Sequence, residues 1–170
     1  GIQQWIWDYG DGTSDTAQTV NHIYGSPGLY NVSFTVTDSN ACRNAAVKPV
    51  RVFELPQAGF GFSTGCVGYG VAFTDSSTIL NPADNGNINS WYWDFGDGND
   101  TTVQNPVYSY GAVGVYNISL IAYSAFGCTD TISRPITVYV PPVAAFTRDT
   151  VCFGLLTQFQ DISVPMPADI

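Results

Sequence analysis

The sequence predicts an all-β fold made of tandem β-sandwich repeats that recur every 86 residues. Aromatic residues are abundant, with ten Phe, ten Tyr and four Trp in 170 residues, whereas only 11% of the residues are charged. Aromatic residues favour strands, and a chain this rich in them with so little charge is folded and not disordered. An internal repeat predicts the tandem units, and an alternation of apolar and polar residues within each repeat predicts the strands.

The internal repeat runs through the whole sequence. The segment WIWDYGDG at 5–12 returns as WYWDFGDG at 91–98, an offset of 86 residues. The same offset relates Cys42 to Cys128, with no gap between the two matches. An offset preserved over this distance predicts structurally equivalent units that follow one another along the chain.

The repeat divides the chain into one complete unit and two partial units. Gly1 aligns with Asn87 and Ile170 with Asp84, so the sequence begins inside a repeat and covers nearly two periods. Proline at both junctions stops strand pairing and stiffens the connection. The predicted organisation comprises late strands of a first repeat at 1–54, a linker at 55–57, a complete repeat at 58–140, a linker at 141–142, and opening strands of a third repeat at 143–170.

Within each repeat, apolar residues alternate with polar ones, which is typical of half-buried strands. Turn signals such as Gly96-Asp97-Gly98 separate these strands, and short strands at this spacing in about 85 residues predict a seven-stranded sandwich. The residues that alternate toward one face form the predicted core, and their copies form a second cluster in the first repeat. The core residues are Trp91, Trp93, Phe95, Tyr116, Ile118 and Leu120.

Three motifs of the complete repeat resemble the PKD domain, an Ig-like repeat named after polycystin. They read WxWDFGDG at 91–98, NPxxxY at 105–110 and GxYNxSL at 114–120. The first copy departs from the second motif, because residues 21–24 read NHIY there. The positions of the cysteines are similar to PKD arrays in very large secreted bacterial surface proteins. The resemblance implies Ig-like sandwiches in an extracellular, cell-surface or secreted protein.

Charge excludes two classes of partner. The net charge of −9 reflects five Lys and Arg against fourteen Asp and Glu. Nucleic acid would require a basic stripe and anionic lipid a polybasic segment, and the sequence has neither. No apolar stretch approaches the ~20 residues that span a bilayer, so we expect no membrane insertion in this segment. The chain has no signal peptide and starts without Met, so we expect the start of a precursor to precede Gly1.

The aspartates of the Gly-Asp-Gly turn suggest calcium, because Asp94, Asp97 and Asp100 bring hard oxygen ligands close together. Aspartate also stabilises tight turns through its own backbone, while glycine takes positive φ. A ligand pattern like that of an EF-hand, with a bidentate Glu, is absent. We therefore favour the structural role and expect no metal and no cofactor.

Catalysis finds little support in the sequence. The single histidine, His22, aligns with Tyr108, so a general base or metal ligand would be replaced by tyrosine in the next copy. One such histidine makes no Ser-His-Asp arrangement, and paired carboxylates for glycoside hydrolysis would have to come from the repeated framework. We predict that this segment is not an enzyme.

The four cysteines Cys42, Cys66, Cys128 and Cys152 indicate an oxidising compartment. In an Ig-like sandwich the loops that hold Cys66 and Cys128 lie at opposite poles, whereas a disulfide needs Cα atoms within about 7 Å. We therefore favour a bond from the Cys66 position of one repeat to the Cys128 position of the next. A bond between Cys66 and Cys128 within one repeat is the alternative, and Cys42–Cys66 is the least favoured pairing.

Several positions match modification or glycan-binding patterns. Asp-Thr pairs resemble the O-glycosylation signal of some Gram-negative surface proteins, and three asparagines match the N-glycosylation sequon. Outward-facing tyrosines can stack on sugars, although packing against neighbouring strands or chains is the favoured reading. The O-glycosylation candidates are Thr16, Thr101, Thr131 and Thr150, the sequon asparagines are Asn31, Asn99 and Asn117, and the tyrosines are Tyr92, Tyr123 and Tyr139.

The predicted function is a structural or adhesive module of an extracellular stalk or filament. Its expected partners are neighbouring repeats or copies of the same chain, end to end. Surface glycans are a further candidate class of partner. The alternative is an accessory spacer or carbohydrate-binding module of a secreted hydrolase. The partial repeats at 1–54 and 143–170 expose apolar strand faces, so we expect them to be completed. Continuation of one long polypeptide is favoured, and head-to-tail donor-strand exchange between chains is the other route.

Overall fold

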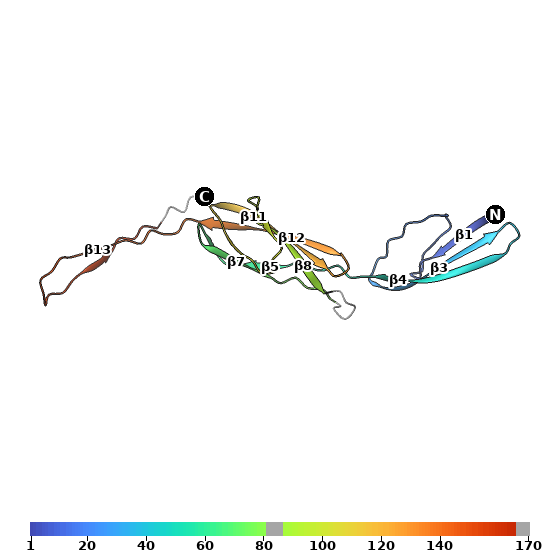
Figure 1. Ribbon diagram of the computed structural model, residues 1–170, viewed down its shortest axis with the longest axis horizontal. Helices are drawn as coiled ribbons and strands as arrows, with labels where there is room; N and C mark the ends of the chain where they lie inside the picture. Colours follow the sequence, from blue (N-terminus) through green and yellow to red (C-terminus); the bar gives the residue numbers. More distant parts are fainter. Residues whose placement is uncertain (81–86, 166–170) are drawn as a thin grey trace.

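The computed structural model describes residues 1–80 and 87–165. Every regular element in these ranges is a β-strand, and none of the described residues forms a helix long and apolar enough to cross a membrane. The chain is elongated, with one sheet near the N-terminus, a closed sandwich in the middle and a hairpin at the far end (Figure 1). The end of the third predicted unit, 166–170, lies outside the described residues.

The complete repeat is a sandwich of a three-stranded and a five-stranded sheet. The orders are β10-β7-β5 and β6-β12-β11-β8-β9, which gives eight strands in place of the seven predicted. The two-residue strands β6 and β9 are too short for an alternation to show in the sequence. The strands are β5 (Phe60–Phe62), β6 (Gly65–Cys66), β7 (Gly70–Asp75), β8 (Ile88–Asp94), β9 (Asp100–Thr101), β10 (Val107–Ser109), β11 (Gly114–Ser124) and β12 (Thr129–Tyr139).

The core between these sheets forms where the alternating residues of both sheets meet. β11 pairs on one side with β12 and on the other with β8, where Leu120 lies opposite Trp93. Trp93 is completely buried and meets the ring of Phe60 edge to face at 5.1 Å between centroids. The predicted core is therefore confirmed in this repeat, with Trp91 and Tyr116 at its margin. The buried cluster contains Phe60, Val71, Phe73, Trp93, Phe95, Tyr110, Ile118, Leu120, Ile136 and Val138.

The first partial repeat contains one sheet, ordered β2-β1-β3-β4. Its strands are the copies of β9, β8, β11 and β12, in the same order. Trp7 stacks on Phe34 at 4.0 Å, but both rings are only half-buried, because no described strand covers this face. The second predicted cluster is thus present as an open face. The strands are β1 (Ile2–Asp8), β2 (Ser14–Asp15), β3 (Gly28–Asp38) and β4 (Arg43–Val52).

The third partial repeat is a hairpin of β13 (Phe146–Arg148) and β14 (Phe159–Asp161). Phe146 pairs with Asp161, just as Phe60 pairs with Asp75 in the complete repeat. The hairpin exposes 65% of Phe146 and 68% of Phe159, whereas their copies Phe60 and Phe73 are 3% and 1% exposed. The same apolar face is therefore covered in one repeat and open in the other.

A ring contact joins the first repeat to the complete repeat. The ring of Phe53, just after β4, stacks on Phe126 in the β11–β12 turn at 3.8 Å with an interplanar angle of 7°. At the start of the complete repeat, the backbone N–H of Ala58 donates to Asp130 Oδ2 at 2.8 Å. The chain therefore enters the sandwich beside the β11–β12 turn and leaves it at the other end of β12.

Candidate functional site

The aspartate loop between β8 and β9 is held by hydrogen bonds within the protein. Asp94 Oδ1 accepts from the N–H of Gly96 at 2.8 Å. Asp97 Oδ1 accepts from the backbone and side-chain nitrogens of Asn99, each at 3.1 Å. The Tyr108 hydroxyl donates to Asp97 Oδ2 at 2.7 Å, so both oxygens of this carboxylate already have donors.

The glycine of this loop is required by its backbone. Gly96 has a φ of +78°, in the left-handed region that L side chains rarely adopt. A Cβ there would also lie 2.7 Å from the carbonyl oxygen of Asn117 in β11. Gly10 repeats the arrangement against Asn31 in the first sheet, with a φ of +76°. The first glycine of the Gly-Asp-Gly motif is therefore required by the close approach of the turn to the neighbouring strand.

His22 occupies the place of Tyr108 in the first repeat. The Tyr108 ring stacks on Phe95 at 3.9 Å, and the His22 ring stacks on Tyr9 at 3.9 Å. His22 Nε2 lies 2.7 Å from Asp11 Oδ2, the counterpart of the bond from the Tyr108 hydroxyl. The histidine therefore supports the turn through a stacked ring and a polar atom, which explains why tyrosine can replace it.

The bonds of this loop shift the pKa values of its carboxyl groups. The side-chain hydrogen bond from Thr13 is the largest cause that lowers the pKa of Asp11 to about 2, with a further contribution from His22. Burial raises the pKa of Asp97, but bonds from the Tyr108 hydroxyl and Asn99 outweigh burial, so this pKa also lies below its ordinary value. The turn in both repeats therefore favours the ionised carboxylate.

The stability from the Asp11 bonds should persist to low pH. Because folding lowers this pKa, that stability is present above the ordinary value of 3.8 and is lost as the pH falls through about 2. We expect an NMR titration of the Asp11 carboxyl carbon to have its midpoint near 2, and Thr13→Val to raise the midpoint. Thr16→Val removes a nearby hydroxyl that makes no bond to Asp11 and should leave it unchanged. An unshifted midpoint in Thr13→Val would contradict this assignment.

The calcium candidates are brought near one another without forming a cage. Asp94 and Asp100 lie directly opposite in the β8–β9 ladder, while Asp97 is turned toward Asn99 and Tyr108. Across residues 1–80 and 87–165, no group of three or more His, Cys, Asp or Glu side chains is placed to hold a metal ion. The absence of a structural metal stays a prediction, tested as follows.

We expect chelation to leave the thermal midpoint of the chain unchanged. The Asp94 and Asp97 carboxylates bond to the loop itself, so removing divalent cations takes away no ligand that the fold needs. Calorimetry with and without EDTA measures this. A midpoint that falls strongly in EDTA and recovers with calcium would instead make Asp94, Asp97 and Asp100 ligands.

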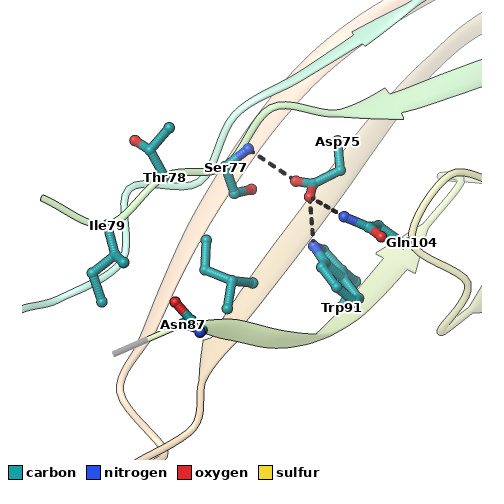
Figure 2. A pocket seen from close by; sticks show the side chains of 8 residues that line it. Asp75, Ser77, Thr78, Ile79, Asn87, Trp91 and Gln104 are labelled. Carbon is teal, nitrogen blue, oxygen red and sulfur yellow. Dashed lines mark hydrogen bonds between the residues drawn. The ribbon is translucent and has the colours of Figure 1, made fainter. Parts of the chain in front are cut away.

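A second polar cluster lies in an open hollow of about 550 Å³ at one end of the sandwich (Figure 2). Asp75 Oδ2 accepts from Trp91 Nε1 at 2.8 Å and from Gln104 Nε2 at 3.1 Å. Asp75 Oδ1 accepts from the N–H of Ser77 at 2.9 Å. One carboxylate therefore ties β7, β8 and the loop before β10 together. Sequence reasoning missed this cluster, although both Asp75 and Trp91 have copies at the 86-residue offset, Asp161 and Trp5.

Replacing Asp75 with alanine should destabilise the complete repeat by about 1–2 kcal/mol, because Trp91 Nε1 and the Ser77 N–H lose their acceptor. Gln104→Ala removes one donor and leaves the Trp91 bond in place, so it should cost less. Urea unfolding followed by circular dichroism compares the two variants. Equal stabilities of the two variants would contradict a central role for the carboxylate.

The predicted disulfide residues are not brought together within one repeat. All four cysteines are free thiols in the structure. Cys66 pairs with Tyr139 at the end of β12, whereas Cys128 precedes Thr129 at its start. Ten residues of strand at roughly 3.3 Å each separate the two ends by about 33 Å, far beyond a disulfide. The bond between Cys66 and Cys128 of one repeat is therefore incompatible with this fold.

The modification and glycan candidates occupy different environments. Thr16, Thr131 and Thr150 are exposed, whereas Thr101 is half-buried, and the sequon asparagines are all exposed. Tyr92 and Tyr123 are half-buried on the face of β8 and β11 turned away from the core, where Tyr92 lies opposite Ile121. Tyr139 is exposed at the end of β12.

Comparison with known families identifies the repeat. A model of the PKD domain matches residues 1–53 and 54–140. The chain belongs to the PKD domain family. Its matched segments correspond to the first sheet and to the complete sandwich, so the PKD repeat is present in tandem.

PKD relatives include parts of bacterial proteases. The chain is 37% identical over 76 residues to a microbial collagenase of Vibrio alginolyticus, covering 45% of this chain and 9% of the relative. It is 36% identical over 56 residues to collagenase ColA of Bacillus cereus, covering 33% of this chain and 6% of the relative. The chain thus spans less than a tenth of these relatives. Among solved structures, the PKD1 domain of Vibrio anguillarum Epp is 30% identical with a TM-score of 0.47, covering 52% of this chain and 99% of that domain.

Proposed function

We propose that this tandem PKD segment is a non-catalytic structural module of an extracellular stalk or filament. The observation that carries the proposal is the end-to-end junction, in which the Phe53 ring of the first repeat stacks on Phe126 of the complete repeat. Pro56 in the short linker restricts the backbone between the two units. Repeats joined pole to pole in this way extend along one axis (Figure 1).

Completion of the partial repeats extends the same axis. The open face of the first sheet is a hollow of about 340 Å³ lined by residues that include Trp7, Val32 and Phe34. In the complete repeat the copies of these residues are buried beneath a β5–β7 hairpin. A hairpin like β13–β14 is the matching cover, since Phe146 and Phe159 stand where Phe60 and Phe73 stand. One continuous polypeptide or separate chains can supply it, and both routes build a non-closing assembly.

Small-angle X-ray scattering tests the stalk. A compact chain of this length would have a radius of gyration of about 16 Å. Three units, each about 36 Å long from an 11-residue strand, give a rod with a radius of gyration of roughly 30 Å. We expect the larger value for the reduced chain at low concentration, and a value near 16 Å would rule out end-to-end stacking.

An extracellular and adhesive setting has three sources of support. The chain carries four cysteines and a single lysine, and its relatives include collagenases and a Vibrio cholerae pre-pro-metalloprotease. Adhesion would use side chains that do not serve the core, and Tyr92 and Tyr123 lie on the outer face of β8 and β11. Surface glycans are the ligand class that such rings can stack on.

The collagenase relatives favour a second candidate, an accessory module that assists a secreted protease. This role would show as binding of the isolated chain to insoluble collagen in a co-sedimentation assay, with chitin and cellulose as comparison matrices. Saturable binding to collagen that Tyr92→Ala abolishes would favour the accessory role. Absence of binding to all three matrices, together with a rod in solution, would favour the stalk.

A further inference from the structure

Each repeat has two kinds of cysteine position, one at each of its poles. One kind, the β6 cysteine, comprises Cys66 and its copy Cys152; the other, the turn cysteine, comprises Cys42 and its copy Cys128. The β6 cysteine lies at the pole where the chain leaves a repeat. The turn cysteine lies at the pole where the chain enters.

The strand ladder fixes the β6 cysteine at the exit pole. Cys66 pairs in parallel with Tyr139, the last residue of β12, and the next N–H, that of Val67, donates to the Tyr139 carbonyl at 2.9 Å. Neighbouring strands lie about 4.8 Å apart, so the Cα of Cys66 is close to that of Tyr139. The copy of Tyr139 in the preceding repeat is Phe53. A β6 cysteine therefore belongs beside Phe53 when the first repeat is complete.

The ring stack fixes the turn cysteine on the other side of the junction. Phe53 stacks face to face on Phe126, which is two residues before Cys128. The turn itself is held, because the N–H of Cys128 donates to Ser124 Oγ at 3.1 Å and its carbonyl accepts from the Ser124 N–H at 2.8 Å. Cys42 occupies the corresponding turn, with its N–H bonded to Asp38 Oδ1 at 2.9 Å. Phe53 thus has one cysteine position beside it in the sheet and the other across the junction.

We infer that consecutive repeats are joined covalently by a disulfide between the β6 cysteine of one repeat and the turn cysteine of the next. The inference rests on the end-to-end stacking proposed above. Two thiols lose two protons and two electrons as the S–S bond forms, and a disulfide oxidant such as oxidised glutathione takes them up and becomes two thiols. Each complete repeat then carries one bond at its entry pole and one at its exit pole.

This pairing gives each cysteine a partner in a neighbouring repeat. Cys66 bonds to the turn cysteine of the repeat that follows, and Cys128 bonds to the β6 cysteine of the repeat that precedes. Suppose that the hairpin of one copy completes the first sheet of the next copy. Cys66 of the first copy then bonds to Cys42 of the next, and Cys152 of the first copy bonds to Cys128 of the next. Two bonds therefore link the copies. The pairing also accounts for two cysteines per repeat that lie about 33 Å apart and cannot bond to each other.

A polypeptide of two copies of the chain tests the inference. Joining them through Asn-Gly, the dipeptide at 85–86, keeps the 86-residue period and completes the central repeat within one molecule. After oxidation with glutathione, peptide mapping should find Cys66 of the first copy bonded to Cys42 of the second. It should also find Cys152 of the first copy bonded to Cys128 of the second. Half of the thiols should therefore lose reactivity toward an alkylating reagent.

Single variants and scattering separate this inference from the stalk. Cys66→Ser in the first copy should abolish only the bond to Cys42 and leave the other bond intact. A bond between Cys66 and Cys128 of the same copy, scrambled pairings or eight reactive thiols would overturn the inference. Scattering from the reduced polypeptide tests the stacking independently of the disulfides. A rod-shaped polypeptide whose thiols stay free after oxidation would refute only the disulfides. A compact particle would refute the stacking.

Discussion

Trp93→Ala should lower the free energy of unfolding of the complete repeat by about 3–5 kcal/mol, the usual cost of truncating a fully buried aromatic side chain to alanine. Trp93 has no exposed surface and lies between the rings of Phe60 and Phe73, at 5.1 Å and 5.7 Å between centroids. Its removal would leave a cavity where the two sheets meet. Urea unfolding followed by circular dichroism measures the loss.

Two matched variants make this test specific. Tyr92→Ala changes the adjacent residue on the outer face of β8, where the side chain is only half-buried, and should cost clearly less. Trp7→Ala makes the same substitution at the copy of Trp93 in the first sheet, whose open face leaves the ring half-buried. If Trp93→Ala were no more costly than these two, the register of β8 against β11 would be wrong.

Phe159→Asp should weaken end-to-end association of the reduced chain by at least about 100-fold. Phe159 is the copy of Phe73, which is 1% exposed in the core of the complete sandwich. An aspartate at position 159 would therefore bury a charge in each completed repeat. A loss of 3 kcal/mol or more corresponds to about two orders of magnitude in the association constant. Sedimentation velocity over a range of concentrations, with reductant present, measures the change.

Leu155→Asp is the matched control on the same hairpin. Its copy in the complete repeat is Tyr69, which is 63% exposed, so a charge at this position stays in water when a sheet is completed. This variant should associate like the parent chain. A parent chain that stays a well-folded monomer at every concentration would remove the basis for completion by β13–β14.

The sequence predicted the parts of the fold that repeat. Trp93 recurs as Trp7 at the 86-residue offset, and Leu120 corresponds to another apolar residue, Phe34, so both the sandwich and its core could be predicted from the chain. The resemblance to an Ig-like sandwich also implied that Cys66 and Cys128 lie at opposite poles, and the structure has them at opposite ends of β12. Local pattern and periodicity are sufficient where the same contacts form in every copy.

Contacts between distant or unlike residues could not be predicted in this way. Trp91 was placed on the core face, but its bond to Asp75 joins strands of opposite sheets, and no local pattern encodes that pairing. The stack of Phe53 on Phe126 carries no periodic signal, because the copy of Phe126 is Asn40. The sequence argued against His22 as a general base, because its copy is Tyr108. Its structural role became evident only from its stacking on the Tyr9 ring and its contact with the Asp11 carboxylate.

The arrangement of β12 determines how a pulling force would act on a repeat. Tension along the axis would pull on the end of β12 at Tyr139 against the opposite pole, parallel to the strand. Ten residue pairs join β12 to β11 in an antiparallel ladder, whose hydrogen bonds run perpendicular to that force, and two more pairs join it in parallel to β6. These bonds would have to shear together, whereas a strand peeled from one end breaks them one after another. We therefore expect each repeat to resist extension and to yield in one step when this ladder fails.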